Sequence, residues 1–143
     1  MIFLSIPNHN GDVTEVLDFV LTLKCNGGTD INSALLEALR VANTDHDKST
    51  PKMIVMLTDG RAQSGETSSP KIKQNIKRAN TGKVSIYGLA FGEDADFDLI
   101  KGISDENLGF ALKISQGKNS FEQIEAFYNQ ISGKVNQFET LMK

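Results

Sequence analysis

Two short polar segments carry the side chains best suited to chemistry in this sequence. One is Thr58-Asp59-Gly60, which follows a continuous apolar run, and the other is Gly27-Gly28-Thr29-Asp30, which precedes an amphipathic one. A carboxylate at the end of a buried strand is costly unless it is solvated, hydrogen-bonded or bound to a cation. Asp59 is therefore a candidate oxygen ligand for a Mg²⁺-like ion, and the Thr29 hydroxyl is a candidate second, neutral ligand.

Both segments also have a purely structural interpretation. Asp59 has the residue type that accepts backbone hydrogen bonds in turns, and Gly60 lets the chain turn sharply. The glycine pair is typical of a helix end, and Thr29 or Asp30 is typical of the cap of the next helix. Two interpretations of these residues therefore remain open: turn and cap roles, and a cation site. The occurrence of both segments in one chain favours the cation site.

Two other charged segments favour structural roles. Residues 94–98 resemble the opening of a calcium loop, but Leu99 stands at position six, where Gly is needed, and Asp105 at position twelve, where Glu is needed. Acidic residues in a first helical turn, where they favour the helix dipole, explain this segment better. A basic stretch without aromatic residues predicts a solvated helix face rather than an anion site; it comprises Lys71, Lys73, Lys77, Arg78 and Lys83.

The sequence shows no signature of catalysis. His9 and His46 lie far apart in polar segments, and Cys25 has no nearby histidine to activate it. Thr81-Gly82-Lys83-Val84 lacks the upstream glycine and the following hydroxyl of a phosphate-binding loop, and no Gly-x-Ser-x-Gly elbow occurs. We therefore expect a protein that is not an enzyme.

Length and composition indicate one ordinary globular domain. The 143 residues carry 15 basic and 18 acidic side chains, and the resulting net charge of −3 argues against general nucleic-acid binding. A single cysteine excludes an internal disulfide. No apolar run approaches the ~20 residues that span a membrane, and the N-terminus lacks the basic region and cleavage site of a secretory signal.

Hydrophobic periodicity predicts alternating strands and helices. Short apolar runs predict strands, and apolar residues three and four apart predict helices. The strands are expected over residues 2–6, 53–57, 84–91 and 110–114, and the helices over 12–24, 31–42, 70–79, 97–103 and 121–131. This alternation favours a parallel sheet with helices on both faces, and the unbroken run 53–57 predicts a strand buried on both faces. Ligands bind at the carboxyl ends of such strands, where Asp59 lies.

Several of these segments together resemble a von Willebrand factor type A domain, in particular the version found in inter-alpha-trypsin inhibitor heavy chains. General superfamily elements are residues 27–35 and 54–60, and features that point to the heavy chains are residues 71–76 and 88–92. The resemblance implies an α/β fold. This fold is a Rossmann-like three-layer sandwich, with a mostly parallel sheet between two layers of helices.

The resemblance also implies a metal-ion-dependent adhesion site on top of the sheet. In the family this site takes an Asp-x-Ser-x-Ser loop, a Thr and an Asp, and its ion, usually Mg²⁺, is completed by a partner's carboxylate or by water. Thr29 and Asp59 match the last two positions, whereas no Asp-x-Ser-x-Ser occurs in this sequence. Since Mg²⁺ needs near-octahedral oxygen coordination, we expect weak binding or none.

The chain resembles the family fold from a later strand onward. We therefore expect residues 1–131 to form a partial von Willebrand factor type A domain that lacks the first strand and first helix, and residues 132–143 to form a C-terminal extension. The missing strand would leave sheet edges unpaired, which favours self-association. An isoform, a partial gene product or an excised piece would explain the same pattern.

By this resemblance the chain is expected to be a non-enzymatic adhesion or protein-interaction module. The heavy chains are secreted subunits of protease-inhibitor complexes and associate with hyaluronan and the extracellular matrix, so a protein or matrix ligand outside the cell is expected. The alternative is a small flavodoxin-like nucleotide-binding domain or enzyme. That alternative needs a Gly-rich phosphate loop or a poised base after a strand, and the sequence contains neither.

Overall fold

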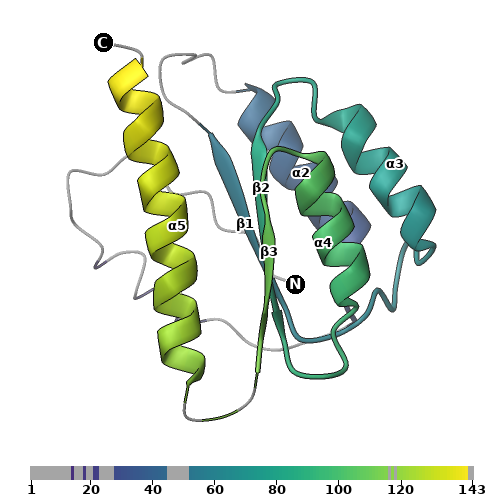
Figure 1. Ribbon diagram of the computed structural model, residues 1–143. Helices are drawn as coiled ribbons and strands as arrows, with labels where there is room; N and C mark the ends of the chain where they lie inside the picture. The colour runs from purple at the N-terminus through teal and green to yellow at the C-terminus, as the bar shows by residue number, and fades with distance from the viewer. Residues whose placement is uncertain are drawn as a thin grey trace.

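Helices and strands alternate along the described part of the chain (Figure 1). The computed structural model describes residues 14, 18, 21, 22, 28–44, 52–115, 117 and 119–141, with backbone only from residue 134 onward. The elements are α2 (Ile31–Thr44), β1 (Met53–Thr58), α3 (Ser69–Ala79), β2 (Ser85–Phe91), α4 (Phe97–Glu106), β3 (Ala111–Ile114) and α5 (Ser120–Leu141). Their order confirms the pattern predicted by periodicity for these ranges.

The described strands form one parallel sheet in the order β1-β2-β3. Thr58 lies opposite Ala90 in the first pair, and Phe91 lies opposite Ile114 in the second. Each pair is joined through a helix, α3 or α4, as parallel strands require. The three strands therefore end at one edge of the sheet, here called the carboxyl edge.

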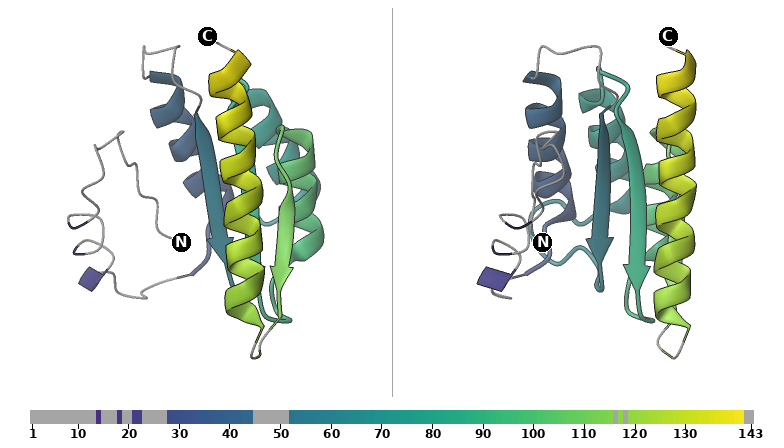
Figure 2. Two further views of the ribbon diagram at one scale, coloured as in Figure 1. Left: turned by 60° about the vertical axis from the view of Figure 1, so that its left-hand side comes forward. Right: turned by 90° about the vertical axis from the view of Figure 1, so that its left-hand side faces the viewer.

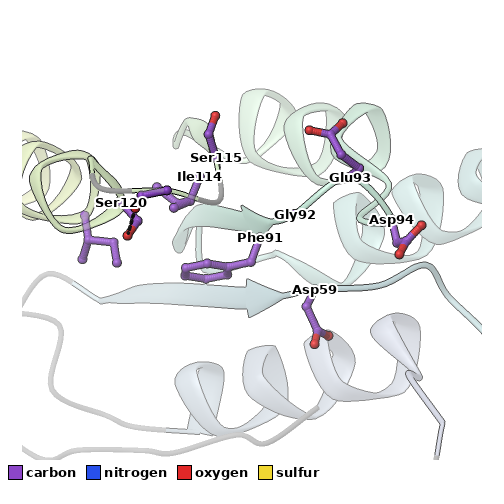
Figure 3. Close-up of a pocket in the computed structure, with 10 residues that line it drawn as sticks. Asp59, Phe91, Gly92, Glu93, Asp94, Ile114, Ser115 and Ser120 are labelled. Atoms are coloured by element: carbon purple, nitrogen blue, oxygen red, sulfur yellow. Dashed lines mark hydrogen bonds between the residues drawn. The ribbon is translucent and has the colours of Figure 1, made fainter.

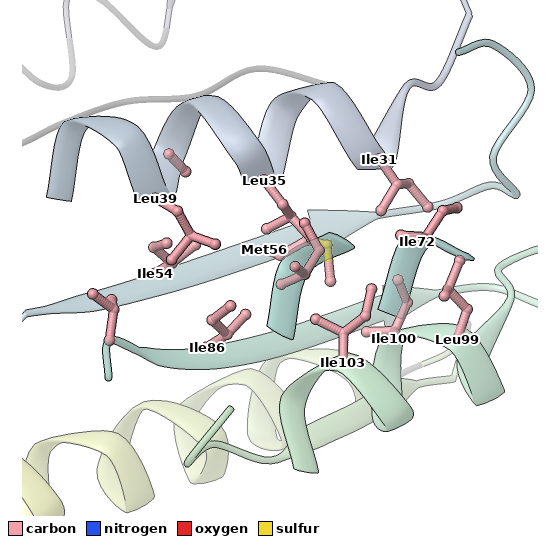
Figure 4. Packing of buried hydrophobic residues seen from close by; sticks show 13 residues of the cluster. Ile31, Leu35, Leu39, Ile54, Met56, Ile72, Ile86, Leu99, Ile100 and Ile103 are labelled. Atoms are coloured by element: carbon pink, nitrogen blue, oxygen red, sulfur yellow. The ribbon is translucent and has the colours of Figure 1, made fainter. Parts of the chain in front are cut away.

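Helices α2, α3 and α4 cover one face of the sheet, here called the inner face (Figure 2). Their apolar side chains form one core with Ile54 and Met56 of β1 and Ile86 of β2 (Figure 4). Ile100 and Ile103 of α4 are fully buried in this core. The inner layer places the start of α2 beside the end of β1.

Helix α5 covers the opposite face, here called the outer face (Figure 2). Phe127 and Ile131 of α5 pack against Tyr87 and Leu89 of β2. The rings of Tyr87, Phe110 and Phe127 meet edge to face, with centroids 5.2 to 6.5 Å apart. Helices on both faces confirm the predicted three-layer arrangement.

The outer face of β1 differs from the sequence prediction. The unbroken apolar run predicts burial on both faces, but burial alternates along the strand. Met53, Val55 and Leu57, here called the β1 strip, are 37%, 41% and 55% exposed. The prediction is wrong for this face because α5 packs over β2 and β3, and no helix within the described ranges buries the strip.

Helix α5 is longer and less buried than the sequence predicts. It runs from Ser120 to Leu141, so the expected domain boundary after residue 131 lies inside the helix. Phe121 and Tyr128 share the apolar periodicity of Phe127, yet they are 74% and 67% exposed, because one helix buries only the stripe that faces the strands. No helix within the described ranges, α5 included, is long and apolar enough to cross a membrane.

Some predicted features lie outside the described residues. The strand predicted over residues 2–6 is one of them, and so are His9, Cys25 and His46. Four residues of the helix predicted over 12–24 are described, and all four are helical: Thr14, Asp18, Leu21 and Thr22.

Adjacent residues of β1 test its one-sided burial. Met56 is 4% exposed in the inner core, so Met56→Ala should lower the free energy of unfolding by about 2–5 kcal/mol through lost burial and a residual cavity. Leu57→Ala on the outer face should lower it by less than about 1 kcal/mol. Urea unfolding of both variants measures the difference, and equal losses would show that the outer side of β1 is also packed.

Candidate functional site

The chain turns sharply at the end of β1. Thr58, the last residue of the strand, is 7% exposed, and its hydroxyl accepts a hydrogen bond from the Gly60 N–H at 3.4 Å. This contact closes the turn with the side chain of Thr58 rather than with that of Asp59. Asp59 is consequently held at the carboxyl edge with its side chain exposed.

The loop that follows β1 holds Thr29 at the same edge. The backbone N–H groups of Gln63 and Ser64 donate to the carbonyl oxygen of Thr29 at 2.8 and 3.3 Å. A second anchor lies at the second residue of α2, where the side-chain amide of Asn75 in α3 donates to the side-chain oxygen of Asn32 at 3.0 Å. These bonds fix the start of α2 against the loop after β1 and against α3.

The structure brings the two sequence-predicted residues to one side of the molecule. A Cβ on Gly60 would lie 3.8 Å from the Thr29 hydroxyl oxygen, so this hydroxyl lies beside the residue that follows Asp59. The Asp59 carboxylate is directed toward α2 (Figure 3). Within the described part of the chain, neither the Thr29 hydroxyl nor the Asp59 carboxylate has a hydrogen-bond or ion-pair partner.

Asp30 has the structural role that the sequence left open for this segment. Its carboxylate accepts a hydrogen bond from the Ser33 N–H at 2.9 Å and so caps α2. The two neighbouring residues therefore differ in role: the Asp30 carboxylate accepts the capping hydrogen bond of α2, whereas the Thr29 hydroxyl has no partner among the described residues. Capping therefore explains Asp30 but not Asp59.

Thr29 and Asp59 together present two oxygen ligands, which is fewer than a tightly bound Mg²⁺ requires. Among the described residues, no group of three or more His, Cys, Asp or Glu side chains is arranged to hold a metal ion. A cation held by this pair would need further oxygens from water or from a bound molecule. The donor types suit Mg²⁺, while their number suits only a weak site.

A cavity of about 580 Å³ opens beside Asp59 at the carboxyl edge (Figure 3). Its apolar part is formed by Phe91 from the end of β2 and by Ile114 and Ile124 from β3 and α5. Its rim carries three acidic residues, Asp59, Glu93 and Asp94. The Glu93 carboxylate accepts a 2.8 Å bond from the Lys113 ammonium, whereas Asp94 has no partner among the described residues.

The sequence interpretation missed Glu93 and Asp94 as residues of this edge. The signal was present, because Phe91-Gly92-Glu93-Asp94 follows β2 just as Asp59 follows β1. The next acidic residue, Asp96, does cap α4, and it accepts from the Leu99 N–H at 3.0 Å. The helix-terminal interpretation of residues 94–98 is therefore confirmed for Asp96 but incomplete for Asp94.

The basic stretch on α3 is a solvated face, as its composition predicts. Lys71 and Lys77 are exposed and make ion pairs with Glu66 at 3.7 Å and with Glu106 at 3.4 Å. Such exposed pairs contribute little to stability. They also reduce the unbalanced positive charge that an anionic ligand would need.

Comparison with known proteins places the chain in a wider context. The family model of the von Willebrand factor type A domain matches residues 3–134. The chain is 32% identical over 135 residues to inter-alpha-trypsin inhibitor heavy chain H1 of Mesocricetus auratus, covering 91% of this chain and 15% of the relative. It is 35% identical over 130 residues to heavy chain H6 of Homo sapiens, covering 85% of this chain and 10% of the relative.

A third relative agrees with these two. Heavy chain H2 of Homo sapiens is 33% identical over 127 residues, which cover 83% of this chain and 13% of the relative. The chain thus spans 10% to 15% of the length of these curated relatives. The similarity therefore concerns one domain of much longer proteins.

The loop that holds Thr29 can be tested at Gly65. Its φ of +66° lies in the left-handed region, and an added Cβ would lie 2.3 Å from the Asp30 carboxylate. Gly65→Ala should therefore lower the free energy of unfolding by about 1–3 kcal/mol through backbone strain and a displaced helix cap. Chemical denaturation measures this loss.

The matched control is Gly133→Ala in α5, where an added Cβ meets nothing within 4 Å. Alanine is the better helix former, so this variant should gain about 0.5–1 kcal/mol. A Gly65→Ala variant as stable as the parent protein would contradict the described loop geometry.

Proposed function

The chain belongs to the von Willebrand factor type A domain family, and we propose that it acts as a non-enzymatic interaction module whose ligand face is the carboxyl edge of its sheet. Similarity to inter-alpha-trypsin inhibitor heavy chains supports an interaction or adhesion role. Parallel α/β sheets bind ligands at this edge, because the loops after all their strands meet there.

One observation carries the proposal. The Thr29 hydroxyl and the Asp59 carboxylate come from distant parts of the sequence, lie at the same edge and have no partner within the described part of the chain. Because both groups are held at this edge without such a partner and are open to solvent, they are available to contact an external group. The backbone bonds from Gln63 and Ser64 keep this arrangement in place.

A weak divalent-cation site forms part of the proposal. Thr29 and Asp59 would hold the ion, and an acidic group of the ligand or water would complete its coordination. The bound ion would supply positive charge that links this edge to an acidic ligand. Because the sequence has no Asp-x-Ser-x-Ser loop, the chain by itself would hold Mg²⁺ only weakly.

The heavy-chain relatives support a proposal for the partner and location. We propose a protein or extracellular-matrix ligand, which includes hyaluronan-associated assemblies, and association with a protease-inhibitor complex, because the relatives are named as heavy chains of a trypsin inhibitor. An extracellular location fits this ligand class. Self-association is a further part of the proposal, since among the described strands β1 pairs with β2 alone, and none of them pairs with its other edge.

Cation binding can be tested by calorimetry and thermal unfolding. Titration with Mg²⁺ or Mn²⁺ should give a dissociation constant of about a millimolar, so that about 10 mM ion raises stability by roughly 1 kcal/mol. Asp59→Asn or Thr29→Ala should abolish that gain. Either substitution should itself change stability by less than about 0.5 kcal/mol, because neither side chain has a folding partner.

Asp98→Asn is the matched control, because Asp98 is an exposed carboxylate in the first turn of α4 that belongs neither to the candidate cation site nor to the cavity lining. Its cation response should equal that of the parent protein. A dissociation constant in the low micromolar range would contradict the incomplete site. Stabilisation by nucleotides instead of cations would favour the flavodoxin-like alternative over an interaction module.

A further inference from the structure

The cavity beside Asp59 has a composition that suits one class of ligand group. We propose that it receives a basic side chain, Lys or Arg, from a protein ligand in which an apolar residue is adjacent to the basic one. This inference rests on the proposed function, because it supplies the chemistry of the ligand at the same edge. It assigns a role to Asp94, which the candidate cation site does not use.

The charge of the cavity favours a cation. Asp59, Glu93 and Asp94 line it, and no Lys or Arg is among its described lining residues. Glu93 is already paired with Lys113, whereas Asp59 and Asp94 have no partner within the described ranges. A basic group at the rim would therefore meet the Asp94 carboxylate and form charge-assisted hydrogen bonds with it.

The spacing of the carboxylates favours an organic cation over a metal ion. The acidic residues of the rim do not form a group that could hold a metal, since no such group of three or more ligating side chains occurs among the described residues. A metal ion needs several oxygens converging on one point. An ammonium or guanidinium group carries several N–H donors and can satisfy separated carboxylates.

The apolar part of the cavity fits the stem of a basic side chain. Phe91, Ile114 and Ile124 form this part, and Ile114 is almost fully buried while Ile124 is 38% exposed. Lys and Arg place their methylene stems on apolar surface while the charged head stays at the rim. The Phe91 ring adds an aromatic surface that attracts a cation.

The β1 strip continues the cavity along the outer face. Leu57 lies opposite Leu89, two residues before Phe91, and Asp59 comes two residues after Leu57, just beyond the end of β1. Val55 and Leu57 are exposed along this line. A ligand with its basic residue at the cavity would therefore place a neighbouring apolar residue against Leu57, which commits the ligand to a polypeptide segment with an apolar residue next to the basic one.

Three short peptides provide the probe: one with the core Leu-Arg-Leu, one with Leu-Gln-Leu and one with Ser-Arg-Ser. Binding is measured by amide chemical shifts of the labelled protein at low salt, without added divalent cations. The Leu-Arg-Leu peptide should shift signals around Phe91 and Asp94 saturably. The other two should bind at least about fivefold more weakly, because the Gln peptide lacks the basic residue and the Ser peptide lacks the apolar ones.

Protein variants place the contact. Asp94→Asn should weaken binding of the Leu-Arg-Leu peptide about fivefold to tenfold. Glu125→Gln removes an equal charge from the exposed surface of α5, outside the cavity lining, and should leave binding unchanged within about twofold. The amide spectrum of each variant shows directly whether its fold is retained.

Several results would overturn the inference: no saturable binding, equal binding of the Arg and Gln peptides, or equal weakening by Asp94→Asn and Glu125→Gln. Its failure is distinguishable from failure of the cation site. Asp94→Asn should keep the thermal response to Mg²⁺, whereas Thr29→Ala should lose that response and keep peptide binding. Loss of both properties in one of these variants would contradict the separation of the two sites.

Discussion

The carboxyl edge depends on two backbone hydrogen bonds, which run from the N–H groups of Gln63 and Ser64 to the carbonyl oxygen of Thr29. They join the start of α2 to the loop after β1, two segments that no local interaction would bring together. Because the bonds use only the backbone, they leave the Thr29 hydroxyl available. Thr58 similarly closes the turn after β1 with its own hydroxyl and leaves the Asp59 carboxylate without a folding partner.

The parallel sheet extends this edge across all three strands. Strands that run in one direction end on one side, so the loops after β1 and β2 deliver Asp59 and Asp94 to neighbouring positions around one cavity. The carboxyl edge has two parts that differ in the chemistry of their side chains. One part presents the unpaired oxygens of Thr29 and Asp59, and the other combines the Asp94 carboxylate with the apolar surface around Phe91.

The outer face of the sheet is covered only in part, and its exposed part adjoins the carboxyl edge. α5 buries the outer side chains of β2 and β3, while the β1 strip stays exposed. Polypeptide ligands use exposed apolar faces, and they also use strand edges such as that of β1, which no other described strand besides β2 pairs with. The surface most suited to a protein partner therefore adjoins the residues most suited to a charged group, which is consistent with an interaction module of the von Willebrand factor type A family.

Periodicity in the sequence was sufficient to predict the elements from Ile31 to Ile131, because spacings of two, three and four residues are set by strand and helix geometry alone. Residue type also singled out Thr29 and Asp59. The one-sided burial of β1 could not be predicted from the sequence, because the same apolar run occurs in strands buried on one face and on both. Only the placement of α5 over β2 and β3 decides it. The tertiary structure also decided which acidic groups are paired. Asp30 and Asp96 cap helices, whereas Asp59 and Asp94 have no partner among the described residues, because hydrogen-bond partners depend on distances that sequence spacing does not define.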